Sequence, residues 1–153
     1  NVMIKVPGTE SGVRAVRTLL ADGINVNVTL LFSVDAHRRV IEAYLDALEA
    51  RAAQGLPIDR VASVASFFVS RVDSEVDRRL DALAAGLPEE RRAHVAALKG
   101  KAAIANAKMA YRLFRSLFAG ERWAALAARG AMVQRPLWAS TSTKNPAYRD
   151  VLY

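Results

Sequence analysis

Residues 24–32, "INVNVTLLF", alternate apolar and polar side chains, which is the period of a β-strand. Asn25, Asn27 and Thr29 share one face of this predicted strand. The opposite face carries Ile24, Val26, Val28 and Leu30. A parallel strand buried under helices on both faces normally has an almost continuous apolar run. The stretch therefore indicates a sheet with one apolar face and one face that carries polar groups.

Residues 1–6, "NVMIKV", repeat the alternation and stop at Pro7-Gly8. Lys5 falls on one face with Asn1 and Met3, and the other face carries Val2, Ile4 and Val6. Two interpretations of Lys5 are open. It can lie on an edge strand and extend its ammonium group to water, or it can be a desolvated, reactive amine. The stretch alone favours the edge strand, but an edge strand does not explain why neighbouring strands also carry polar groups on one face.

The rest of the chain alternates between strand-like and helix-like periods. Further strands are predicted within 60–69 and 133–140. Helices are predicted from a Thr9 cap to Leu20, from a Ser33 cap to about Gly55, from Val72 to a break at 85–90, and then as one or two helices to about Arg129. This order, βαβαβααβ, is typical of a parallel sheet with helices outside. It gives no sign of a second domain, so residues 1–153 are predicted to form a single one.

A closed parallel barrel accounts for the two kinds of sheet face. Its outer face packs on helices, and its inner face lines a polar pocket at the carboxyl ends of the strands. Such a barrel has eight strands, whereas this chain supplies about four. Half a barrel would leave two strand edges open, and open edges pair with other chains. We therefore expect part of a (β/α)8 barrel, which belongs to a longer protein or assembles with another chain.

The composition is that of a soluble globular protein of one-domain size. The 153 residues include no cysteine, which excludes disulfides, thiolate catalysis and cysteine-bound metal. No apolar run reaches the roughly 18 residues that a membrane-spanning helix needs. The formal charge is +7, but between Asp73 and Asp81 acids and arginines alternate, as is typical of a solvated helix face. Neither nucleic acid nor a membrane is an expected partner.

Five blocks of the sequence together resemble one known family. They are "NVMIKVPGTESG", "GINVNVTLLFS", "VASVASFFVSRVD", "GKAAIANAKMAY" and "RPLWASTSTKNPAY". In order and spacing they are similar to successive blocks of transaldolase, in its long bacterial form. The resemblance implies strands four to seven of a (β/α)8 barrel. It also implies a cytoplasmic transferase of the pentose phosphate pathway that moves a dihydroxyacetone unit between sugar phosphates, such as sedoheptulose 7-phosphate and fructose 6-phosphate, without metal or organic cofactor.

The resemblance assigns catalytic roles to residues of the first two strands. Lys5 matches the family's Schiff-base lysine, whose amine attacks the ketose carbonyl. An apolar surround would favour the free amine, so burial is expected to make Lys5 reactive. Thr29 matches the threonine that holds a catalytic water. Asn27 matches the asparagine that binds the dihydroxyacetone hydroxyls.

Four further residues match substrate-binding positions of the family. Ser66 matches a residue near the bound triose unit, and Arg71 matches the phosphate-binding arginine. In the segment "STSTKN", Ser142 and Lys144 match the later phosphate loop, where some family members carry arginine in place of this lysine. From the residues alone, strand-end hydrogen bonds would explain Asn27 and Thr29, and a solvated helix start would explain Arg71.

Other conspicuous residues are expected to be structural. His37 and His94 are predicted to lie on helix surfaces. Trp123 and Trp138 are predicted to anchor packing. "GTESG" resembles a phosphate loop but lacks the Gly-Lys-Ser/Thr ending. No carboxylate pair or metal-ligand cluster stands out in the sequence.

The family also needs acid and base carboxylates on strands one to three, which the chain does not supply. We therefore expect the isolated chain to be nearly inactive. Two alternatives remain open. One is a related class I sugar-phosphate aldolase, and the other is a non-catalytic half-barrel that self-associates through its open strand edges. The expected partners are sugar-phosphate substrates, together with the remainder of the barrel or a second copy.

Overall fold

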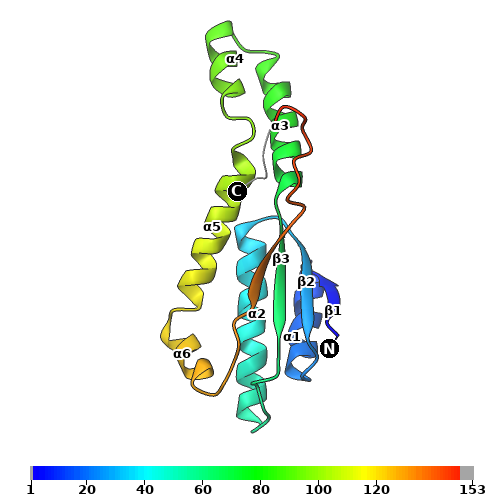
Figure 1. Cartoon of the computed structure of the whole chain (residues 1–153), viewed down its shortest axis with the longest axis vertical. Coiled ribbons are helices and arrows are strands. Elements are labelled where there is room, and N and C mark those ends of the chain that lie inside the picture. The colour runs from blue at the N-terminus through cyan, green and yellow to red at the C-terminus, as the bar shows by residue number, and fades with distance from the viewer. Residues whose placement is uncertain (1, 149–153) are drawn as a thin grey trace. The chain divides into compact units, whose positions relative to one another are not determined.

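The computed structural model describes residues 2–148 (Figure 1). In that part of the chain the elements are β1 (Ile4–Pro7), α1 (Glu10–Ala21), β2 (Val26–Leu31), α2 (Val34–Ala53), β3 (Ser63–Phe68), α3 (Ser70–Ala84), α4 (Glu89–Ala96), α5 (Ala102–Leu117), α6 (Glu121–Ala127) and β4 (Arg135–Ala139). The predicted alternation of strands and helices is confirmed. Three helices, not one or two, lie between the break after α3 and β4. Gly100, at φ +73°, lies between α4 and α5 and helps to divide them.

The strands form one sheet in the order β1-β2-β3-β4. β1 and β3 both run parallel to β2. Gln134, just before β4, donates to Ser63 at the start of β3, and Val69 N–H after β3 donates to the carbonyl of Ala139 at the end of β4. The start of β4 therefore lies beside the start of β3, and the end of β4 lies beside the end of β3, so β4 runs parallel to β3. This is the α/β arrangement expected for part of a (β/α)8 barrel.

Two helix starts are fixed by caps that the sequence predicts. Thr9 accepts a hydrogen bond from Gly12 N–H at the start of α1, and Ser33 accepts one from Ala36 N–H at the start of α2. α1 and α2 pack on each other and on the sheet. The fully buried side chains of this region include Val16, Leu20, Val26, Val28, Leu31, Ile41 and Tyr44. This core holds β1 and β2 in the positions that the candidate site needs.

β2 departs from strict alternation near its end. Leu30 has φ +61°, and the register with β3 shifts between Val28 and Leu31. As a result Leu30 is exposed while Leu31 is buried. The prediction that Leu30 shares the buried face of Val28 is therefore wrong. The cause is a bulge, which inserts one extra residue and turns the following side chains by one position.

The chain divides into two compact units. Unit 1 contains residues 1–67 and 109–137, and unit 2 contains residues 68–108 and 138–153. The single-domain assignment of residues 1–153 stays a prediction. Asn1 and the ending "DVLY" lie outside the described residues. Within the described part, no helix has the length and apolar character needed to cross a bilayer.

Candidate active site

Lys5 and Asn27 are cross-strand neighbours in unit 1. The parallel register pairs Lys5 with Asn27 and Pro7 with Thr29. Residues that face each other across paired strands have their side chains on the same face of the sheet. The predicted grouping of Lys5 with the polar face of β2 is therefore confirmed.

Lys5 itself is exposed, which differs from the sequence expectation. β1 is an edge strand of the described sheet and pairs with β2 alone. Only one of its long edges is covered, and its side chains are exposed or half-buried. The expected apolar surround of Lys5 is therefore absent from this sheet, and burial does not account for a reactive amine here.

Ser66 brings β3 into the same group. Its hydroxyl donates to Asn27 Oδ1 at 2.8 Å. Ser66 is buried and Asn27 is half-buried, so the bond is shielded from competing water. Because Asn27 Oδ1 accepts from Ser66, the amide N–H groups of Asn27 point away from that bond. The side chain can then donate to a hydroxyl at the polar face.

Thr29 lies at the carboxyl end of β2, immediately before the bulge. It is buried, and its carbonyl accepts from Gly8 N–H at 2.8 Å. The left-handed conformation of Leu30 costs about 1–3 kcal/mol, and such strain is concentrated at functional sites. Ser140, just after β4, is the second non-glycine residue with positive φ in residues 2–148, at +56°. Leu30 is the second-last residue of β2, and Ser140 directly follows β4.

The glycines of "GTESG" serve close packing. A Cβ on Gly12 would lie 1.9 Å from the Pro7 carbonyl oxygen, and one on Gly8 would lie 2.3 Å from Leu31 Cδ2. Only glycine lets α1 begin this close to the end of β1. The phosphate-loop appearance of this segment is therefore explained by sterics.

Arg71 belongs to unit 2 and lies in the first turn of α3. Its guanidinium carbon is 5.1 Å from the centre of the Phe68 ring. Stacking on an aromatic face restricts the guanidinium while leaving its edge donors accessible. Arg71 is exposed, so it can meet an anion from solution.

Ser142 and Lys144 are brought together in the segment that follows β4. Lys144 Nζ donates to Ser142 Oγ at 2.8 Å. An ammonium beside a hydroxyl is a donor pair suited to a phosphate oxygen. The seven predicted site residues thus fall into two groups, with Lys5, Asn27, Thr29 and Ser66 in unit 1 and Arg71, Ser142 and Lys144 in unit 2.

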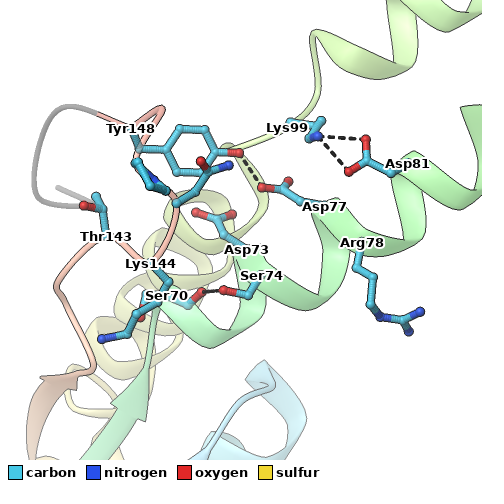
Figure 2. Close-up of a pocket in the computed structure, with 12 residues that line it drawn as sticks. Ser70, Asp73, Ser74, Asp77, Arg78, Asp81, Lys99, Thr143, Lys144 and Tyr148 are labelled. Carbon is cyan, nitrogen blue, oxygen red and sulfur yellow. Dashed lines mark hydrogen bonds and ion pairs between the residues drawn. The ribbon is translucent and has the colours of Figure 1, made fainter.

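A pocket of about 390 Å³ lies within unit 2, beside α3 (Figure 2). Its lining includes Lys144 and the acids Asp73, Asp77 and Asp81. Asp73 and Asp77 are only 3% and 7% exposed. The prediction that the acids of 73–81 form a solvated helix face is therefore wrong for these two.

Both buried acids bind backbone amides at the start of α5. Asp73 Oδ1 accepts from Ala103 N–H at 2.8 Å, and Asp77 Oδ1 accepts from Gly100 N–H at 3.1 Å. Ala103 N–H is one of the amides that a helix start leaves without an intrahelical partner, and Gly100 lies two residues before the helix. Burial raises the pKa of Asp73. Asp73 and Asp77 are four residues apart, a spacing that places two side chains on the same face of a helix. This spacing could have indicated from the sequence that the two acids lie together.

Tyr148 closes the pocket from the C-terminal side. Its hydroxyl donates to Asp77 Oδ2 (Figure 2). Its ring lies against Gly100. Burial, followed by the bond to Asp77, raises the pKa of Tyr148 to about 12. The phenol is therefore a hydrogen-bond donor throughout the neutral range. Sequence reasoning did not single out this residue.

His37 is fully buried, so its predicted surface position is wrong. Its ring lies 5.6 Å from that of Phe67, neither ring nitrogen has a hydrogen-bond partner, and burial lowers its pKa to about 4. His94 is exposed as predicted. Trp138 packs on Val69 and Ala103, and Trp123 meets Phe118 edge to face; both confirm the packing assignment.

The described residues contain no cluster of three or more histidine, aspartate or glutamate side chains able to hold a metal ion. Unit 1 supplies a nucleophile, the amine of Lys5, and hydrogen-bonding amide and hydroxyl groups. Unit 2 supplies the cations Arg71 and Lys144. An amine with neighbouring hydrogen-bond donors can form an imine with a carbonyl compound. Arginine and lysine can bind a phosphate group.

Comparison with known proteins gives consistent matches over the whole chain. A family model described as "Transaldolase/Fructose-6-phosphate aldolase" matches residues 1–153. The chain is 54% identical over 154 residues to a transaldolase of Trichodesmium erythraeum and 55% identical over 155 residues to transaldolase 2 of Nostoc. It is 54% identical over 153 residues to transaldolase 1 of Streptomyces avermitilis. Each alignment covers 100% of this chain and 39–41% of the relative.

Proposed function

We propose that this chain, which belongs to the transaldolase/fructose-6-phosphate aldolase family, supplies the Schiff-base lysine and part of the substrate-binding surface of a transaldolase. It spans about 40% of the length of the curated relatives it matches. The observation that carries the proposal is the row of polar groups across three strands. Lys5 pairs in register with Asn27, and Asn27 accepts from Ser66 at 2.8 Å.

In the proposed reaction, Lys5 Nζ attacks C2 of a ketose phosphate such as sedoheptulose 7-phosphate or fructose 6-phosphate, and loss of water gives a protonated imine. The C3–C4 bond then breaks, its electron pair moves toward the imine, and the C4 hydroxyl loses its proton as the aldose phosphate leaves. The three-carbon unit stays on Lys5 as an enamine. Attack of that enamine on an aldose phosphate acceptor and hydrolysis of the new imine complete the transfer.

The other residues bind and orient the substrate in this proposal. Asn27 donates to a hydroxyl of the triose unit, and Ser66 fixes its amide. Thr29 holds the water that hydrolyses the imine. Arg71, Ser142 and Lys144 are the phosphate ligands. Proton transfer by a positioned acid or base is worth roughly two to four orders of magnitude in rate. We expect those carboxylates outside this chain, so the chain alone should be nearly inactive.

Borohydride trapping tests the nucleophile directly. The chain is incubated with fructose 6-phosphate, reduced, and analysed by peptide mass spectrometry. We expect an adduct on Lys5, derived from the ketose phosphate or, if the chain cleaves it, from dihydroxyacetone, and the loss of that adduct in Lys5→Met. Lys108→Met is the matched control, because Lys108 is an exposed lysine on α5. Labelling spread evenly over exposed lysines would show that Lys5 has no special reactivity.

A related class I aldolase is the second candidate, because the matching family also includes fructose-6-phosphate aldolase. The two activities differ in the fate of the triose unit. Release of free dihydroxyacetone indicates an aldolase, whereas transfer to erythrose 4-phosphate indicates a transaldolase. The assay is made on the chain together with the remainder of the barrel.

Association through strand edges is a proposal that the edge position of β1 supports. Sedimentation of the chain at several concentrations checks it, and a monomer at every concentration would contradict it. A non-catalytic half-barrel would associate without forming the Lys5 adduct. The cytoplasmic location and the absence of nucleic-acid and membrane partners stay predictions.

A further inference from the structure

The segment from Ser140 to Tyr148 follows β4 and lies beside α3 in unit 2 (Figure 2). Its first residue is held at the start of α3, because the Oγ atoms of Ser140 and Ser70 are 2.8 Å apart and Ser70 N–H donates to the Ser140 carbonyl at 2.9 Å. Its last described residue is held at Asp77. Ser70 and Asp77 are about two helical turns apart, or roughly 10 Å along the axis.

The two ends of this segment bracket Ser142 and Lys144. Lys144 Nζ already donates to Ser142 Oγ at 2.8 Å. Each residue of a mobile loop costs about 1–2 kcal/mol to order. A loop that is already held at both ends loses less conformational entropy when the anion binds, so it binds the anion more tightly.

The second attachment point is rigid and shaped for an aromatic ring. Asp77 is buried and also accepts from Gly100 N–H at 3.1 Å, so its carboxylate is fixed by a backbone group. Gly100 has φ +73°, and a Cβ there would lie 2.8 Å from Tyr148 Cζ. The ring of Tyr148 therefore occupies space that only a glycine leaves open.

We propose that Tyr148, through its hydroxyl bond to Asp77, is a positioning residue for the Ser142–Lys144 phosphate loop. The proposal rests on the proposed function, which assigns phosphate binding to that loop. Tyr148 does not contact the phosphate itself. It acts by restricting the backbone on the C-terminal side of Lys144, while the Ser140–Ser70 contact restricts the other side.

The test measures the affinity of the chain for inorganic phosphate by calorimetry and amide hydrogen exchange of residues 141–147 by NMR. We expect Tyr148→Phe to weaken phosphate binding about five-fold, the effect of one lost hydrogen bond, and to speed exchange in the loop. Asp77→Ala should do the same. Asp77→Asn keeps a single oxygen, which cannot accept from both Gly100 N–H and the phenol, so it should recover only part of the affinity. Tyr111→Phe, an exposed tyrosine of α5 in unit 1, is the control.

The outcomes separate this proposal from the proposed function. If Lys144→Ala weakens phosphate binding but Tyr148→Phe changes neither affinity nor exchange, the phosphate loop stands and the positioning role is wrong. If Lys144→Ala has no effect on phosphate affinity, the loop is not a phosphate site. The positioning role of Tyr148 and the phosphate-binding role of the loop are then both wrong. If Tyr148→Phe lowers the melting temperature while loop exchange and affinity stay unchanged, Tyr148 is structural only, and the positioning role is again wrong.

Discussion

Ser66 on β3 donates its hydroxyl hydrogen to Oδ1 of Asn27 on β2, at a distance of 2.8 Å. Asn27 is in turn the register partner of Lys5 on β1. One hydrogen bond and one strand pairing thus connect three of the proposed site residues across three neighbouring strands. The orientation of the Asn27 amide depends on the residue type at position 66.

Replacing Ser66 with alanine should affect both stability and chemistry. We expect a loss of about 1 kcal/mol in the free energy of unfolding, because a buried acceptor loses its donor. The Lys5 adduct from fructose 6-phosphate should also decrease, because the Asn27 amide can then turn. Urea unfolding and borohydride trapping measure the two effects. Ser116→Ala, at an exposed position on α5, should change neither. A destabilised Ser66→Ala with normal adduct yield would assign the bond to the fold alone.

Acidification should destabilise the chain through His37, whose pKa burial lowers to about 4. The unfolded chain takes up a proton near pH 6.5 and the folded chain only near pH 4, so stability falls as the pH falls through this window. We expect a loss of about 2 kcal/mol between pH 7 and pH 5. His37→Leu should remove this component, as measured by urea unfolding at both pH values. His94→Gln, at an exposed site, should keep the wild-type slope; an unchanged slope in His37→Leu would contradict the assignment.

A methyl group at position 12 should disrupt the junction of β1 and α1. In Gly12→Ala the new Cβ would lie 1.9 Å from the Pro7 carbonyl oxygen. We expect a loss of about 2–3 kcal/mol in thermal or urea unfolding, because backbone has to move. Gly86→Ala is the matched control, since its Cβ would meet nothing within 4 Å. Equal effects at the two positions would show that glycine flexibility, and not the close approach, is what matters at Gly12.

Arg122 on α6 ties that helix to α2 through three carboxylates. Its guanidinium binds Glu49 and Asp46, each at 2.6 Å, and also Glu42. Arg122→Met should cost about 1 kcal/mol at low salt and less at 1 M salt, because the group is partly exposed and screened. Arg92→Met, which breaks only a pair within α4, should have little effect in urea unfolding. A loss that does not depend on salt would point to packing of the Arg122 stem instead.

The same cluster adds a pH dependence at the acid end. The hydrogen bond from Arg122 lowers the pKa of Glu49. The Glu49–Arg122 bond contributes fully to stability at pH values above the pKa of glutamate in the unfolded chain, about 4.3. This contribution is lost as the pH falls through the lower pKa of Glu49 in the folded chain. Arg122→Met should therefore lose less stability than the wild type between pH 5 and pH 3.

The polar face of the sheet was predictable because period-two alternation determines which side chains share a face. Lys5, Asn27 and Ser66 lie together for that reason. The pattern could not reveal the left-handed conformation of Leu30, which is an ordinary apolar residue in a strand-like run. For Lys5 the stretch alone favours an exposed edge strand, as the structure shows, and the expectation of a buried amine came from the barrel interpretation and the family resemblance.

Two errors in the helices have different physical origins. Asp73 and Asp77 looked solvated because charged residues surround them, whereas their partners are amides at Ala103 and Gly100, far along the chain. His37 could have been found from sequence. It lies four residues before Ile41 and seven before Tyr44, which is the spacing of the buried face of α2.

The bulge in β2 makes a one-residue deletion informative. Removing Leu30 would restore simple alternation after Thr29. Leu31 would then be the second residue after Val28, so its side chain would still point into the core. The hydrophobic interior would keep its residues, and the strained backbone at φ +61° would disappear. A deletion scan of this strand should therefore find Leu30 dispensable for folding. What the shortened chain would lose is the left-handed turn that directly follows Thr29 near the end of β2.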